Sequence, residues 1–191
     1  MAFPRSGTVD TQTFSGTKDF VFGRLNTTQS TNIGSADHLK FDTVDFQRPL
    51  IVSPTTGAAG GSAESLDTST AYSNTSGVAS IGRISVRGGK VYKLECSPGY
   101  VLFSGATGAL TLQWFDVTGA AGVAVGSPMF IEPVTQTTND IASGDLWTFY
   151  APGGGQNDIF LLEVQIVGAP TALTSIGSAT KGQPTFLVET Y

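Results

Sequence analysis

Short segments in which apolar and polar residues alternate, separated by turns rich in glycine and proline, constrain this chain more than any other feature. The pattern is clearest between residues 81 and 117. Successive side chains of a β-strand point to opposite faces, so this alternation gives each segment one buried and one solvated face. We therefore expect an antiparallel meander at the centre of the molecule. Its inward positions are Tyr92, Leu94 and Cys96 in one segment and Leu110, Leu112 and Trp114 in another.

The composition favours an all-β fold. Charged residues make up only 13% of the chain, Gly accounts for 24 of 191 residues, and no window keeps a helical period of apolar residues. A chain of this length buries enough surface for one domain. About eight to ten strands at short spacing are typical of a β-sandwich or jelly roll. The predicted strands are residues 38–46, 49–52, 78–86, 90–96, 100–104, 109–117, 123–131, 146–151, 158–167 and 185–190.

Residues 1–37 are predicted to form an extended N-terminal arm, followed by a sandwich domain over residues 38–191. The arm is polar and Thr-rich, so it cannot form a core of its own, yet it carries several aromatic side chains. Two interpretations stay open: the arm lies over a partner or a neighbouring subunit, or it folds back on its own domain. The candidate arm contacts are Phe3, Arg5, Phe14, Phe20, Phe22 and Arg24.

Charge is distributed unevenly along the chain. The net charge is −5, which argues against direct nucleic-acid binding because phosphates require a basic footprint. Residues 1–93 carry nine of the ten basic residues, whereas residues 94–191 carry eight of the fifteen acidic ones. The asymmetry indicates either docking through the N-terminal part or simple drift in composition. No apolar segment is long enough to cross a membrane or to act as a signal peptide, so we expect a soluble protein made in a cytoplasm.

The sequence offers no catalytic or cofactor site. His38, the one histidine, lies at the edge of a predicted strand, and Cys96, the one cysteine, occupies an inward position. We therefore predict a protein that is not an enzyme and binds no cofactor. A calcium site at Asp140, Asp145 and Asp158 is a weaker hypothesis, because these loops lack the alternating acidic pattern of a calcium loop.

A group of aromatic residues is the remaining candidate for binding. Such side chains stack on sugar rings in some binding sites, but they more commonly pack in a core or between subunits. We favour packing in the core or at a trimer interface. The residues are Trp114, Phe115, Trp147, Phe149 and Tyr150.

Three stretches resemble the C1q/TNF-like jelly-roll domains of tailed-bacteriophage structural proteins. They are the Gly-Gly-Lys-Val-Tyr-Lys-Leu run at Gly88–Leu94, the Leu-Gln-Trp-Phe-Asp run at Leu112–Asp116, and the apolar strand Ile159–Val167 after a Pro-Gly-rich turn. A final strand that ends with the chain completes the likeness, which covers about residues 39–52 and 78–191.

The resemblance implies a homotrimer that performs a structural task in the virion. We expect a capsid decoration (cement) protein, made in the host cytoplasm, that binds the major capsid protein on the outer capsid surface and stabilises the shell. The short chain lacks the coiled-coil or β-helical shaft of a fibre, which favours decoration. The alternative is the tip of a head or tail fibre that binds a host receptor or glycan. Neither role involves a membrane.

Overall fold

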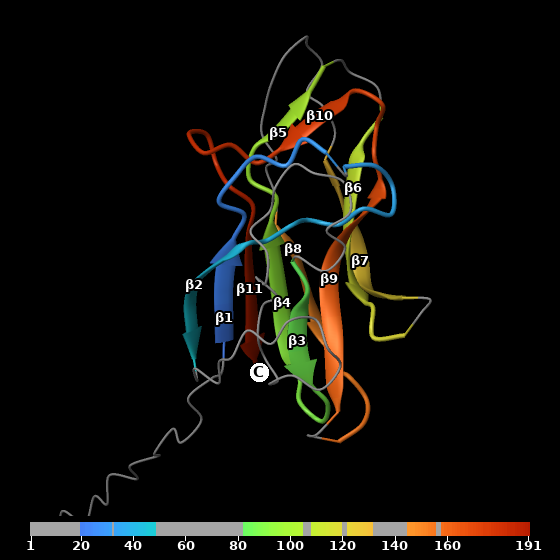
Figure 1. The fold of residues 1–191 in the computed structure, drawn as a ribbon. Helices are drawn as coiled ribbons and strands as arrows, with labels where there is room; N and C mark the ends of the chain where they lie inside the picture. The colour runs from blue at the N-terminus through green and yellow to red at the C-terminus, as the bar shows by residue number, and fades with distance from the viewer. Residues whose placement is uncertain are drawn as a thin grey trace, which may run out of the picture.

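The computed structural model describes residues 20–31, 33–48, 82–104, 108–119, 122–131, 145–155 and 158–191, which form strands and no helix (Figure 1). None of these residues belongs to a helix able to span a membrane. The strands are β1 (Phe20–Arg24), β2 (Thr43–Arg48), β3 (Ile84–Arg87), β4 (Tyr92–Ser97), β5 (Val101–Phe103), β6 (Leu110–Asp116), β7 (Val123–Ile131), β8 (Leu146–Tyr150), β9 (Ile159–Gly168), β10 (Leu173–Ile176) and β11 (Thr185–Thr190).

The strands form two main antiparallel sheets with a small two-stranded sheet, β10-β5, at one end (Figure 1). One main sheet has the order β2-β1-β11-β4-β8 and the other has the order β3-β9-β6-β7. The pairing is nested along the chain: β1 pairs with β11, β3 with β9, β4 with β8 and β6 with β7. Such nesting of early strands with late ones defines a jelly roll. The predicted all-β antiparallel jelly-roll sandwich is therefore confirmed.

The expected central meander is wrong. The consecutive strands β3, β4, β5 and β6 do not pair with one another; each pairs with strands that come later in the chain. Between β3 and β4 the chain passes from one sheet to the other. A Cβ at Gly88 would lie 2.5 Å from the carbonyl oxygen of Gly155, so this corner packs directly against the turn before β9. Alternation predicts which face is buried, but it does not specify the partner strand.

The described part of the predicted arm also differs from an extended segment. Residues 20–24 form β1, which lies between β2 and β11 in the five-stranded sheet. Val21 and Leu25 are buried in the core, which explains why this stretch folds with the domain. For residues 20–31 and 33–37 the structure therefore supports the interpretation in which the segment folds back on its own domain. Residues 1–19, like the predicted strand 49–52, lie outside the described residues.

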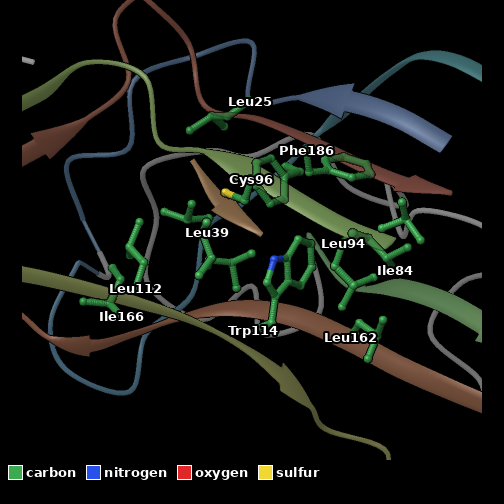
Figure 2. Packing of buried hydrophobic residues seen from close by; sticks show 14 of the residues in the cluster. Leu25, Leu39, Ile84, Leu94, Cys96, Leu112, Trp114, Leu162, Ile166 and Phe186 are labelled. Atoms are coloured by element: carbon green, nitrogen blue, oxygen red, sulfur yellow. The ribbon is translucent and has the colours of Figure 1, made fainter. Parts of the chain in front are cut away.

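The core lies between the two main sheets, where the predicted inward positions are buried (Figure 2). Trp114 from β6 has no exposed surface and reaches toward Leu94 of β4 across the sandwich. Cys96 is buried, and burial raises the pKa of its thiol, so it stays protonated as a small core residue. The other labelled core residues come from both sheets and from the segments beside them: Leu25, Leu39, Ile84, Leu112, Leu162, Ile166 and Phe186.

Candidate functional site

The outer face of the five-stranded sheet carries exposed aromatic side chains. On the edge strand β8, Trp147 and Phe149 are 60% and 47% exposed. Their ring centroids lie 6.2 Å apart in a T-shaped arrangement, and the ring of Phe149 lies 5.1 Å from that of Tyr191. Tyr191 is itself 79% exposed. These three rings form a continuous apolar row that the described chain leaves open to solvent.

Strand register places more apolar side chains on the same face. Residues directly opposite each other in antiparallel strands share a face. Phe46 lies opposite Phe22, Phe22 opposite Leu187, and Leu187 opposite Glu95, which in turn lies opposite Trp147. Phe46 is 66% exposed, and its ring centroid lies 6.3 Å from that of Phe22. We call this surface the aromatic face; its apolar residues are Phe22, Phe46, Trp147, Phe149, Leu187 and Tyr191.

The aromatic face continues to the edge where the two sheets meet. An open hollow of about 650 Å³ lies between β7 and β8, lined by residues that include Met129, Trp147 and Phe149. Gly126 of β7 has a φ of 71°, and a Cβ there would lie 2.3 Å from the Oγ1 of Thr148. Glycine is therefore required for this close approach of the two edge strands. Phe130, also on β7, is exposed as well.

The outer face of the four-stranded sheet carries a second feature, a buried polar cluster. Residues 36–39 run beside the second half of β9. The Leu39 amide donates to the Val164 carbonyl, and the Ile166 amide donates to the Asp37 carbonyl. The Gln29 side chain, also buried, donates to the carbonyl of His38 and accepts from the amide of Lys40. These bonds hold residues 36–40 against the sheet.

Three ionisable side chains in this cluster are almost completely buried: His38, Lys40 and Glu163. The Lys40 Nζ lies 3.0 Å from Nε2 of His38, and Nδ1 of His38 lies 3.8 Å from the Glu163 carboxylate. Glu163 accepts hydrogen bonds from Arg83 Nε at 2.9 Å and from Gln165 Nε2 at 2.8 Å. Burial lowers the pKa of Lys40, an effect that the neighbouring carboxylates oppose.

Glu163 should make the stability of the protein depend on pH. Burial alone would raise the pKa of Glu163, but His38 and the hydrogen bonds from Arg83 and Gln165 outweigh it and hold the pKa below its ordinary value of 4.5. A carboxyl with a lowered folded-state pKa contributes stability above its unfolded pKa and loses that contribution as the pH falls through the folded pKa.

We therefore expect the difference in thermal midpoint between the native chain and Glu163→Gln to be larger above about pH 4.5 than below it, and to shrink progressively as the pH falls through this range. Thermal unfolding followed by circular dichroism across this range measures it. A difference that stays constant with pH would contradict the role assigned to the Glu163 charge.

The structure separates the predicted aromatic site residues rather than bringing them together. Trp114 belongs to the core, and Phe115 is half-buried on β6. The Tyr150 hydroxyl donates a hydrogen bond to the Asp116 carboxylate. Burial is the main cause that raises the pKa of this phenol, and the hydrogen bond to Asp116 is the second. Only Trp147 and Phe149 lie on the exposed face. Trp114 therefore packs in the core, whereas the interface role of Trp147 and Phe149 stays a prediction.

Of the predicted arm contacts, Phe20, Phe22 and Arg24 lie in β1. Arg24 is partly exposed, and its Nη2 lies 3.4 Å from the Asp45 carboxylate. Phe3, Arg5 and Phe14 lie outside the described residues, so their part in partner binding stays a prediction.

The proposed calcium ligands are not brought together by the described chain. The Asp158 carboxylate accepts from the amide of Gly155, which closes the turn before β9. Among the described residues, no group of three or more His, Cys, Asp or Glu side chains could hold a metal ion. Asp140 lies outside these residues, so the hypothesis stays untested.

No protein-family model and no curated protein matches the sequence. Comparison with solved structures finds murine APRIL in crystals at pH 8.0, with 10% identity and a TM-score of 0.46 over 90% of this chain and 98% of that one. The globular domain of zebrafish complement 1qA matches with 8% identity and a TM-score of 0.38 over 91% and 94% of the two chains. The jelly-roll assignment rests on the nested strand pairing described above.

Proposed function

We propose that the protein is a homotrimeric structural protein of a bacteriophage virion that decorates the outer capsid surface. The observation that supports this most directly is the aromatic face. Exposed rings grouped on one sheet face are typical of a surface that is buried by another protein. The resemblance to phage jelly-roll domains supports a second and a third copy of this chain as the partners on that face.

The arrangement of the apolar surface fits a closed ring. Apolar side chains lie on the outer face of the five-stranded sheet, on both sides of the Lys93–Glu95 ion pair, and other apolar side chains, including Met129 and Trp147, lie along the edge formed by β7 and β8. A contact in which the edge of one subunit packs on the sheet face of the next joins two different surfaces, and such contacts close into rings when the rotation permits. A stable interface buries about 800 Å² per partner. Three subunits joined in this way would cover the aromatic face of each.

Capsid decoration would then be a purely adhesive function. In this proposal the N-terminal residues, with Phe3, Arg5 and Phe14, grip the major capsid protein, and the trimer bridges neighbouring capsid subunits. A ligand that binds only the assembled shell stabilises the shell by mass action. No bond-making step is required, which agrees with the prediction that the protein is not an enzyme.

Deleting residues 1–19 tests the capsid-binding role. We expect the truncated chain to remain a folded trimer, because β1 begins at Phe20, and to lose its binding to undecorated capsids. Light scattering after gel filtration measures the oligomer, and co-sedimentation with capsids measures binding. A double variant, Phe3→Ala with Phe14→Ala in the full chain, provides a matched control for changes in chain length. A truncated trimer that still decorates capsids would refute the arm as the attachment site.

The alternative, a fibre tip that binds a host receptor or glycan, is favoured by one observation. The polar cluster around Glu163 lies on the four-stranded sheet, away from the aromatic face, and borders an open hollow. Mixing the protein with undecorated capsids and, separately, with host cells distinguishes the two functions. Depletion by capsids alone supports decoration, whereas depletion by cells alone supports a fibre tip.

A further inference from the structure

The hollow beside the polar cluster has the size of a small-ligand site. It measures about 470 Å³, within the range of about 300–1,000 Å³ typical of such sites. Residues 36–40, β9, Arg83 before β3 and the loop after β6 each contribute to its lining. Most of the described side chains that line it are polar, whereas the hollow between β7 and β8 has a mixed lining of polar and apolar side chains.

The polar groups of this hollow are held in place by a buried carboxylate. One oxygen of Glu163 accepts from Nε of Arg83 and the other accepts from Nε2 of Gln165. The Glu163 side chain is 4% exposed, whereas that of Arg83 is 32% exposed. Because the bond to Arg83 uses Nε, both Nη groups of the guanidinium remain as donors, and within the described residues no other hydrogen bond reaches it. Preorganised donors of this kind reduce the entropic cost of binding a ligand.

The charge balance of the lining decides the class of ligand. Lys40 and Arg83 supply two positive charges, while Asp37 and Glu163 supply two negative ones. An anion would be attracted by the two positive side chains but repelled by the two carboxylates. A cation would be attracted by the carboxylates and repelled by the positive side chains. A neutral molecule with adjacent hydroxyl groups can hydrogen-bond to both the donors and the acceptors of the lining, because each hydroxyl both donates and accepts. Such a molecule carries no charge, so neither pair of charged side chains repels it.

The rim of the hollow leaves room for such a ligand to enter. Gly119, in the loop after β6, also lines the hollow, and a Cβ built there would meet no other atom within 4 Å. A Cβ can therefore be added at this position without a close contact to the described residues. The site lies on the sheet opposite the aromatic face, so it stays accessible when that face is covered.

From these observations we propose that the hollow binds a saccharide unit through Arg83 and Gln165, with Glu163, His38 and Lys40 as the positioning residues behind them. The inference deepens the alternative function, because the same hollow is the observation that favours a glycan-binding fibre tip. It does not depend on the oligomeric state.

Binding of simple glycosides to the full-length protein tests this site. The probes are the methyl glycosides of glucose, galactose, mannose and N-acetylglucosamine, with sodium phosphate and sodium acetate as anion probes, measured by saturation-transfer NMR and calorimetry. We expect at least one glycoside to bind with a Kd of about 1 mM, and neither anion to compete. Arg83→Gln should weaken that binding about tenfold or more, the loss expected for a buried or charged hydrogen bond.

Two further variants keep the result interpretable. Arg87→Gln makes the same change of charge four residues further along the chain, outside the hollow lining, and should leave binding unchanged. Gly119→Tyr should block the hollow and abolish binding while the thermal midpoint stays at the native value. Comparison with this variant shows whether a loss of glycoside binding in Arg83→Gln is caused by misfolding. Absence of binding by all four glycosides, tighter binding of phosphate or acetate, or binding retained in both Arg83→Gln and Gly119→Tyr would each overturn the proposal.

Discussion

Replacing Trp114 with alanine should lower the free energy of unfolding by about 3–5 kcal/mol, the range found for deleting a fully buried large aromatic side chain. The Trp114 ring has no exposed surface and fills the space between the two sheets near Leu94 (Figure 2). The loss combines the transfer free energy of the ring with the cavity left behind. Urea denaturation of both chains at one protein concentration measures the difference.

Trp114→Phe is the matched control for this change. The indole nitrogen of Trp114 is buried and has no hydrogen-bond partner among the described residues, so the substitution removes a polar atom that forms no bond. We expect a cost well below that of Trp114→Ala. A change within about 0.5 kcal/mol for the alanine variant would contradict the central position of the ring.

A negative charge on the aromatic face should convert the proposed trimer to monomers. We expect Trp147→Asp to shift the trimer–monomer equilibrium by at least about a hundredfold, because the interface would bury an unpaired carboxylate in place of a ring. In a monomer Trp147 is 60% exposed, so the fold itself should tolerate the change. Sedimentation velocity over a range of protein concentrations measures the equilibrium.

Val167→Asp adds the same charge to an exposed position on β9, in the other main sheet. It should leave the oligomer unchanged and so controls for the charge alone. A trimer that persists in Trp147→Asp but dissociates in Val167→Asp would place the subunit interface on the four-stranded sheet. A native chain that is monomeric at micromolar concentration would contradict the proposed assembly outright.

The alternation of apolar residues predicted the faces of the strands well. Residues 185–190 were predicted as the last strand and form β11, and the predicted inward positions Leu110, Leu112 and Trp114 are buried on β6. These predictions succeed because the two-residue period of a strand depends only on local geometry. The strand partners were not predictable in this way, since a register or pairing choice depends on which distant segment covers the same surface.

Two strands escaped prediction because their local signals are weak. β1 has only five residues and ends in Gly23 and Arg24, and β10 has only four. Each is stabilised mainly by its neighbours in the fold: β1 by pairing with β11, and β10 by pairing with β5. A short segment gains its extended conformation from such long-range contacts rather than from its own propensity.

The candidate sites were also only partly predictable from the sequence, because contacts between distant segments determine which side chains come together. Trp147 and Phe149 were selected from the sequence, but Tyr191 and Phe46 were not. Strand register places Phe46 on this face, and a ring contact with Phe149 places Tyr191 there. Glu163 alternates with the inward residues of β9, so the pattern alone places it on the solvated face of the strand. Residues 36–40, about 125 positions earlier, hydrogen-bond beside β9 and bring the buried His38 side chain to 3.8 Å from the Glu163 carboxylate. No periodicity within β9 could reveal these contacts.

The position of β11 has a consequence for how the protein folds. β11 lies between β1 and β4, so the middle of the larger sheet forms only when strands that are far apart in the sequence come together. The entropic cost of closing these long loops precedes the gain from the contacts, which slows folding. Until β11 docks, β1 and β4 present open strand edges that invite pairing with other chains.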